Sequence, residues 1–374
     1  DNETFTIGAD ANEVNVNAID FTQVSAINAG TSAEDAIVAV GTAVNAALTS
    51  SDNGLTASNI AFSNINDVAL NNGELTGTNL DNETFTIGAD ANEVNVNAID
   101  FTQVSAIDAG TSADDEIITT AKVDAELTSA NNGLVASNIA FSNINKAGLS
   151  TGELQGTDAD SETFTIDTDA NEVNVNAIDF TRVSAIDAGD SVNDSVIATV
   201  AVDGELTSDN NALNASSINF TNINAANLNG GVLAGTDAES EIFNIGAVNN
   251  AVKVNSIDFT QVTEINAGNS SADEIVATAP VNATLTGIDN AVDASGIAFT
   301  NVNTADLNTG VLTGSANADV FALDAAGLIA NQILFTAINS LVDAQGGADD
   351  VTGMVDIDWT LTAENGALSS VPYQ

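Results

Sequence analysis

The chain contains no cysteine and no histidine among its 374 residues. These absences exclude disulfide bonds, thiolate or imidazole metal ligands, and catalysis by Ser-His-Asp or Cys-His groups. No apolar run approaches the roughly 18 residues that a membrane-spanning helix needs. Proline occurs only at Pro280 and Pro372, so no proline-rich linker divides the chain.

Basic residues are nearly absent as well. The sequence has 53 acidic residues and only four basic ones, which gives a formal net charge of −49. DNA, RNA and anionic membranes are bound through lysine and arginine. The charge therefore argues against all three as partners and favours cations. The basic residues are Lys122, Lys146, Arg182 and Lys253.

What the sequence has instead is a long internal repeat. The 27 letters DNETFTIGADANEVNVNAIDFTQVSAI at residues 1–27 return unchanged at residues 81–107. Related copies follow at a nearly constant spacing, and the chain is 44% hydrophobic, which argues against disorder. We interpret the chain as one continuous array with repeats at 1–80, 81–159, 160–238, 239–316 and a truncated fifth copy, 317–374.

The phenylalanines follow the repeat without exception. A weaker echo, Ile-x-Phe-[Ser/Thr]-x-[Val/Ile], appears twice in each full repeat, first at Ile19 and again at Ile60. All 14 phenylalanines occupy three positions, which predicts equivalent slots in a repeating core. The positions hold Phe5, Phe85, Phe164, Phe243 and Phe321; Phe21, Phe101, Phe180, Phe259 and Phe335; and Phe62, Phe141, Phe220 and Phe299.

Short strands are the predicted local structure. TFTI, EVNVN and IDFTQV alternate apolar and polar residues, and clusters such as SSDNG and NNG separate them. We predict an all-β, parallel β-solenoid with roughly four coils of about 20 residues in each repeat. Tandem immunoglobulin-like sandwiches are the alternative fold. In the solenoid, Asn15 and Asn17 would stack on their counterparts and form amide ladders.

Two families of Gly-containing loops end in an acid. One family contains GTSAEDAI at 30–37, and the other contains GTNLDNETF at 77–85. Both resemble the calcium-binding nonapeptide of RTX proteins, in which a glycine precedes an acid and an apolar residue follows two places on. The Gly-Gly pair of that motif is missing here. The candidate ligands are Asp35, Asp115, Asp194, Asp273, Glu83, Glu162, Glu241 and Asp319.

These acids allow two interpretations. In one, carboxylates and backbone carbonyls hold Ca²⁺. In the other, the acids lie in solvated turns, and cations only screen them diffusely. No cofactor is required in either. Adjacent acids such as Asp114 and Asp115 could suggest acid–base catalysis, but acids recur in every repeat, whereas a catalytic site is needed once. We therefore expect no enzyme.

The last residues differ from the rest of the chain. Its single tryptophan and single tyrosine, Trp359 and Tyr373, both lie in the final part of the sequence. Terminal repeats are normally atypical because they close an exposed core. These two aromatics are therefore predicted to form either a cap or an assembly joint.

Taken together, the repeats, the richness in Asn, Thr, Ala, Gly and Asp, and the phrase LTGSANADVFAL at 312–323 resemble large repetitive adhesins of bacterial surfaces, both filamentous-haemagglutinin-like and RTX-type. The resemblance implies a secreted, cell-surface protein with a role in adhesion or a matrix. Our leading hypothesis is an extracellular structural protein that stacks head to tail into a fibre. The alternatives are a stalk segment of a larger adhesin and a Ca²⁺-binding RTX-like module.

Overall fold

Every regular element of the computed structural model is a β-strand, and the strands stack as coils of a β-solenoid of about 11 turns. The structure describes residues 2–342, 349–353 and 367–368. The predicted solenoid is confirmed, and the alternative of tandem sandwiches is wrong, because neighbouring coils pair in parallel. Within these residues, no helix has the length and apolar character to span a membrane.

The chain forms two compact units, and each is described by itself. Unit 1 comprises residues 1–164 and 170–191, and unit 2 comprises residues 165–169 and 192–374. The strands of unit 1, with β18 at its boundary, are β1 (Thr4–Ile7), β2 (Val14–Val16), β3 (Ile19–Phe21), β4 (Ala26–Asn28), β5 (Ala36–Ala39), β6 (Ala46–Leu48), β7 (Leu55–Ala57), β8 (Ile60–Ser63), β9 (Asp67–Thr76), β10 (Thr84–Ile87), β11 (Val94–Val96), β12 (Ile99–Asp108), β13 (Glu116–Thr119), β14 (Ala125–Leu127), β15 (Leu134–Ala136), β16 (Ile139–Ser142), β17 (Lys146–Gln155), β18 (Thr163–Ile166), β19 (Val173–Val175) and β20 (Ile178–Asp187).

Unit 2 repeats the same order of strands. They are β21 (Ser195–Ala198), β22 (Gly204–Leu206), β23 (Leu213–Ala215), β24 (Ile218–Thr221), β25 (Ala225–Asn227), β26 (Val232–Ala234), β27 (Ile242–Ile245), β28 (Ala251–Val254), β29 (Ile257–Thr260), β30 (Glu264–Asn266), β31 (Glu274–Ala277), β32 (Ala283–Leu285), β33 (Val292–Ala294), β34 (Ile297–Thr300), β35 (Thr304–Thr313), β36 (Val320–Leu323), β37 (Leu328–Ala330), β38 (Ile333–Val342), β39 (Asp350–Thr352) and β40 (Ala367–Leu368).

One coil is longer than the sequence suggested. Thr4 on β1 lies beside Ala36 on β5, and Ala36 lies beside Asp67 on β9. The contact between Glu3 and Asp35 shows the same separation of 32 positions from one coil to the next. The prediction of four shorter coils in each repeat is therefore wrong. The additional residues form hairpins, in which the chain turns back before it continues around the stack.

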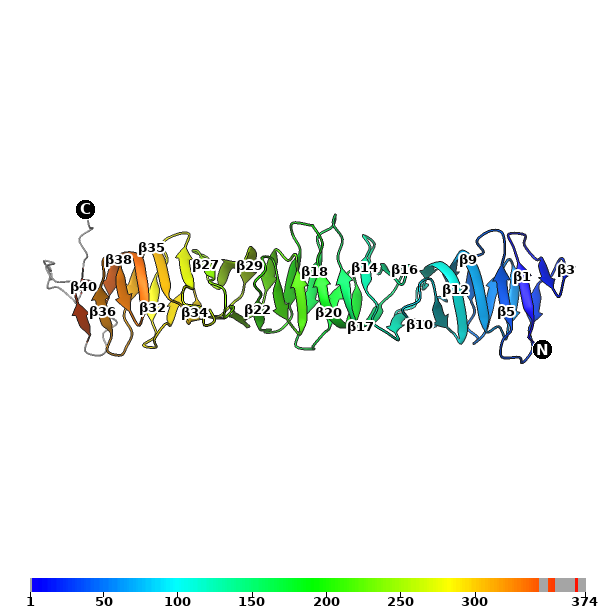
Figure 1. Cartoon of the computed structure of the whole chain (residues 1–374), viewed down its shortest axis with the longest axis horizontal. Coiled ribbons are helices and arrows are strands. Elements are labelled where there is room, and N and C mark those ends of the chain that lie inside the picture. Colours follow the sequence, from blue (N-terminus) through cyan, green and yellow to red (C-terminus); the bar gives the residue numbers. More distant parts are fainter. Residues whose placement is uncertain (1, 343–348, 354–366, 369–374) are drawn as a thin grey trace. The chain divides into compact units, whose positions relative to one another are not determined.

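Each repeat contains two such reversals, one on each of two faces. Face A contains β1, β5 and the first part of β9, and face B contains β6, β8 and the last part of β9. On face A, β1, β2 and β3 form an antiparallel meander, and β5 then joins the free edge of β1. Later in the same repeat, β6, β7 and β8 form the same meander on face B. The two echoes of each repeat are therefore the same motif on opposite faces (Figure 1).

The ten-residue strands pass from one face to the other. In β9 the corner lies at Asn71, Asn72 and Gly73, and both asparagines have positive φ angles. A Cβ on Gly73 would lie 1.9 Å from the carbonyl oxygen of Val44, so only glycine fits at this corner. The pairing with β12 is interrupted there and then resumes on face B.

A left-handed asparagine holds successive meanders in place. Asn132, with a φ of 59°, lies in the turn between β14 and β15. Its amide Nδ2 donates to the carbonyl oxygens of Ile144 (2.8 Å) and Ala177 (2.9 Å), and its backbone N–H donates to Asn176. Because residues 176–177 belong to the next meander, this one residue joins successive half-repeats. We call this arrangement the Asn clasp.

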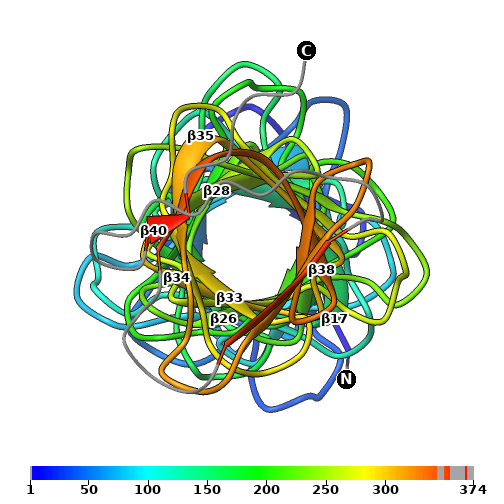
Figure 2. The same cartoon turned by 90° about the vertical axis from the view of Figure 1, so that its left-hand side faces the viewer.

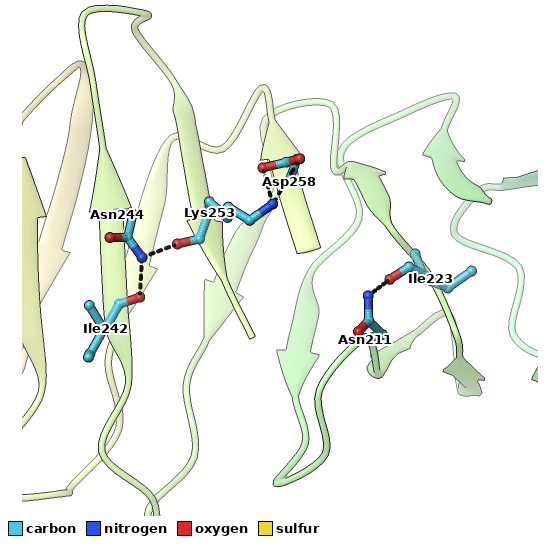
Figure 3. Close-up of polar contacts among 6 residues, drawn as sticks. All are labelled: Asn211, Ile223, Ile242, Asn244, Lys253 and Asp258. Carbon is cyan, nitrogen blue, oxygen red and sulfur yellow. Dashed lines mark hydrogen bonds and ion pairs between the residues drawn. The ribbon is translucent and has the colours of Figure 1, made fainter. Parts of the chain in front are cut away.

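The clasp recurs eight times in the two units. All eight asparagines have positive φ, and each amide donates to a carbonyl twelve positions ahead. Figure 3 shows one of them, in which Asn211 donates to Ile223 at 2.9 Å. The clasp residues are Asn12, Asn53, Asn92, Asn132, Asn171, Asn211, Asn250 and Asn290.

The predicted amide ladders of Asn15 and Asn17 do not form. Asn15 instead donates across its own hairpin to Asp20 (2.7 Å), and Asn17 occupies a turn with a φ of 51°. In this fold the clasp amides bind backbone carbonyls at turns rather than one another along the stack.

Phenylalanine fills the core between the faces. Thirteen of the fourteen are buried, and Phe21 is the exception. Rings of the first and third positions meet edge to face across the core, as in Phe5–Phe62 (6.0 Å between centroids) and Phe243–Phe299 (6.1 Å). Such pairs add about 0.5–1.5 kcal/mol beyond the burial of their area. In the view along the stack, the space inside the ribbons of unit 2, outlined by β33, β35 and β38, holds these side chains (Figure 2).

Replacing a clasp amide with a carboxylate tests this account. Asn132→Asp keeps a side chain that tolerates positive φ but removes both amide donors and places a charge against two carbonyl oxygens. We expect unit 1 to lose about 2–3 kcal/mol, measured by chemical denaturation. Asn131→Asp adds the same charge at the neighbouring exposed position and should leave stability nearly unchanged. Equal losses in the two variants would contradict the clasp.

Candidate functional site

The eight acids proposed as metal ligands are all buried. Each side chain is at most 2% exposed, although the surface of the protein is otherwise rich in carboxylates. The interpretation of these residues as solvated turns is therefore wrong. Each acid directly precedes a strand at a corner of the coil, as Glu83 precedes β10 and Asp115 precedes β13.

The two families of loops meet between neighbouring coils. Asp115 accepts a hydrogen bond at Oδ1 from the backbone N–H of Glu83 (2.8 Å), and Glu83 accepts one at Oε1 from the N–H of Thr78 (3.1 Å). The N–H of Asp115 in turn donates to Oδ1 of Asn145 on the next coil (3.1 Å). One polar side chain per coil thus binds the backbone of its neighbour.

Unit 2 contains the same arrangement. The N–H of Glu241 donates to Asp273 Oδ1 (3.0 Å), and Thr236 donates to Glu241 Oε1 through both its N–H (3.1 Å) and its hydroxyl (2.6 Å). The N–H of Asp273 donates to Oδ1 of Asn303 (2.9 Å). We refer to Glu83 with Asp115 and to Glu241 with Asp273 as the carboxyl pairs.

Two further candidates make the same contacts within their own units. In unit 1, Glu162 accepts at Oε1 from the N–H (3.3 Å) and the hydroxyl (2.6 Å) of Thr157. In unit 2, the N–H of Asp194 donates to Oδ1 of Asn224 (3.1 Å). Both acids therefore bond to the backbone or to polar groups of the corner, as the carboxyl pairs do.

The remaining candidates form related contacts near the ends of the described chain. Asp35 accepts from the N–H of Glu3 (2.9 Å). Asp319 accepts from Ser315, and its own N–H donates to Asp349 (2.9 Å). The position of the acid is thus used in each repeat, with Asp or Glu according to the loop.

Each carboxyl pair has one oxygen per residue that accepts no hydrogen bond. These atoms are Glu83 Oε2, Asp115 Oδ2, Glu241 Oε2 and Asp273 Oδ2, and all four are buried. Burial raises the pKa of Glu83 and of Asp115, and the nearby Asp114 raises that of Asp115 further. Burial, together with the neighbouring Glu241, raises the pKa of Asp273 to about 6.

Lysine does not neutralise these pairs. Lys146 forms its ion pair with Asp114 at the surface (2.8 Å), and Lys253 binds Asp258 at 3.1 Å across an exposed hairpin (Figure 3). Beside it, the Asn244 amide donates to the backbone oxygens of Ile242 and Lys253. Across residues 2–342, 349–353 and 367–368, no three Asp, Glu, His or Cys side chains gather as a metal site would require. Calcium at the pairs therefore stays a prediction.

A second candidate site is the outer edge of β3 and β4. In the described part of the chain, β3 pairs only with β2, and β4 pairs only with β8. Ile19 and Phe21 are consequently 57% and 45% exposed, whereas Ile99 and Phe101 in the identical phrase of the second repeat are 0% and 1% exposed. The difference arises because β9 covers β12 on both faces. No local signal in the sequence distinguishes the two copies.

The predicted joint or cap at Trp359 and Tyr373 lies outside the described residues. The predicted acids Asp114 and Asp115 do not form a catalytic pair: Asp114 binds Lys146 at the surface, while Asp115 is buried. No family model, curated protein or solved structure matches this chain.

The two copies of the phrase allow a matched test of the edge. Phe101→Ala should cost about 3–5 kcal/mol, because it leaves a cavity in a closed core. Phe21→Ala, in the same local sequence, should cost far less because that ring is already half exposed. Denaturant midpoints of the two variants measure the difference, and similar losses would mean that Phe21 is covered in solution.

Proposed function

We propose that this chain is an extracellular structural protein of a bacterial surface, which adds to further copies of itself and so builds a fibre or matrix. The observation that carries the proposal is the open edge of β3 and β4, with Ile19 and Phe21 exposed. Unpaired edges recruit strands from other molecules unless lysine, proline or a covering element protects them. The Ile-Asp-Phe strand has neither lysine nor proline.

The second repeat supplies a template for what would bind there. In that repeat β9 lies along β12, with Val68 beside Phe101 and Leu75 beside Ile107. A β9-like strand from a second copy would cover Phe21 and Ile27 in the same register. Because such a contact joins two different surfaces, it does not close into a dimer and instead propagates as a filament.

The charge of the chain favours growth at the edge over lateral association. Each copy carries a formal charge of −49, so parallel surfaces repel one another. The screening length is about 10 Å at 0.1 M salt, and cations are therefore natural partners of the assembly. The phenylalanine core would carry no direct role in assembly beyond keeping the edge rigid.

Two other functions remain as proposals. A calcium-binding module is favoured by the buried carboxyl oxygens that accept no hydrogen bond. A stalk segment of a larger secreted adhesin is favoured by the near-identical repeats, which give reach without a specific ligand. We propose neither catalysis nor a resident cofactor.

Electron microscopy of the purified chain in millimolar calcium tests the assembly. We expect continuous filaments. Phe21→Lys should abolish them, because it places a charge on the apolar edge, whereas Leu80→Lys, at a position that is 92% exposed in a loop, should not. Filaments of Phe21→Lys would place the joint elsewhere, and separate particles of the unmodified chain would support the stalk.

A further inference from the structure

We propose that each carboxyl pair is a proton-binding site, in which a single proton is held between Glu83 Oε2 and Asp115 Oδ2, and likewise between Glu241 Oε2 and Asp273 Oδ2. The inference is independent of the proposed assembly. It rests on four buried acceptor atoms in two equivalent sites, one in each unit.

Each pair lacks one hydrogen-bond donor. In unit 2, Glu241 Oε1 accepts from Thr236, and Asp273 Oδ1 accepts from the N–H of Glu241. The second oxygen of each carboxyl has no donor, and a buried acceptor without one is costly. Two carboxylates cannot supply it to each other. A single added proton turns one of the two oxygens into a donor and satisfies both.

A proton fits the site better than calcium does. Ca²⁺ takes six to eight oxygen ligands, whereas the pair supplies only two free carboxyl oxygens, and the described chain shows no third acid beside them. A lysine does not take the role either, because Lys146, the basic residue next to the unit 1 pair, is engaged with Asp114 outside the core. The proton is the smallest cation that can lie between two oxygens at hydrogen-bond distance.

The charged and polar groups around each pair act in the same direction. For Glu83 with Asp115, the neighbouring charge that acts on the pair is Asp114, which disfavours a second negative charge. The facing polar groups are Thr78 and Asn145. For Glu241 with Asp273, the groups facing the pair are Thr236 and Asn303, both neutral.

The raised pKa of Asp273 sets the sign of the pH effect. Its value is about 6 in the folded chain against an ordinary 3.8, so the folded state binds the proton more tightly than the unfolded state. The resulting stabilisation is complete below pH about 4, and it is lost as the pH rises through about 6. The difference of about two between these pKa values corresponds to roughly 100-fold in the folding equilibrium constant. Weak acid should therefore lock the coils together.

A glutamine in place of one acid tests the site. In Glu241→Gln the amide supplies a permanent donor to Asp273 Oδ2 and mimics the shared proton. At pH 7 we expect its folding constant to exceed that of the unmodified chain by roughly tenfold or more, since each pKa unit is worth tenfold. The advantage should vanish below pH about 4. Glu264→Gln removes the same charge from an exposed position and should show no such gain.

Two further measurements keep the proposal falsifiable even if Glu241→Gln does not fold. Infrared spectra of the unmodified chain at pH 5.5 should retain the band of protonated carboxyls, because exposed acids are already ionised there. Loss of that band in the folded protein would overturn the proposal. Calcium titration at pH 7 is the second measurement. If calcium stabilises the unmodified chain and Glu264→Gln but not Glu241→Gln, the pair is a metal site and the proton assignment is wrong.

Discussion

The Asn clasp is the constraint on which the rest of this fold depends. A simple solenoid needs corners only where the chain changes face, but here the chain must also reverse within a face and return. The reversal leaves backbone groups at the turn without partners, and a buried or half-buried carbonyl must be bonded. A left-handed asparagine supplies both the turn and the missing donors, as Asn132 does for Ile144 and Ala177. The period of the sequence follows from this spacing.

The exchange of faces explains why the full repeat is twice as long as the motif that it contains. Meanders alternate between face A and face B, so two half-repeats are needed before the chain returns to its starting face. The phenylalanines of the first and third positions then meet across the core, as Phe85 and Phe141 do at 6.2 Å. The carboxyl pairs use the same geometry, because their two acids come from loops that lie 32 positions apart, which is one coil.

The sequence predicted the materials of this structure better than their connection. The alternating strands, the register of the phenylalanines and the particular acids at the corners could be read directly. The coil length could not, because IDF has the same period of two whether the strand pairs in parallel or returns antiparallel. The burial of Asp115 and Glu83 was missed for a related reason. A Gly-rich acidic loop is usually solvated, and only the stacking of the next coil closes these two over each other. The exposure of Phe21 depends on a neighbour and not on its own sequence.

The backward reach of each meander gives the units a particular response to tension. Although β12 follows β10 and β11 in the chain, it lies against β9 of the preceding repeat on both faces. A pull on the chain therefore cannot extract an internal repeat without first breaking contacts that belong to its neighbour. Unravelling has to begin at an end and advance by one clasp at a time. At about 3.5 Å per extended residue, each half-repeat would release roughly 140 Å of chain, so the material would yield in equal steps and absorb work at each one.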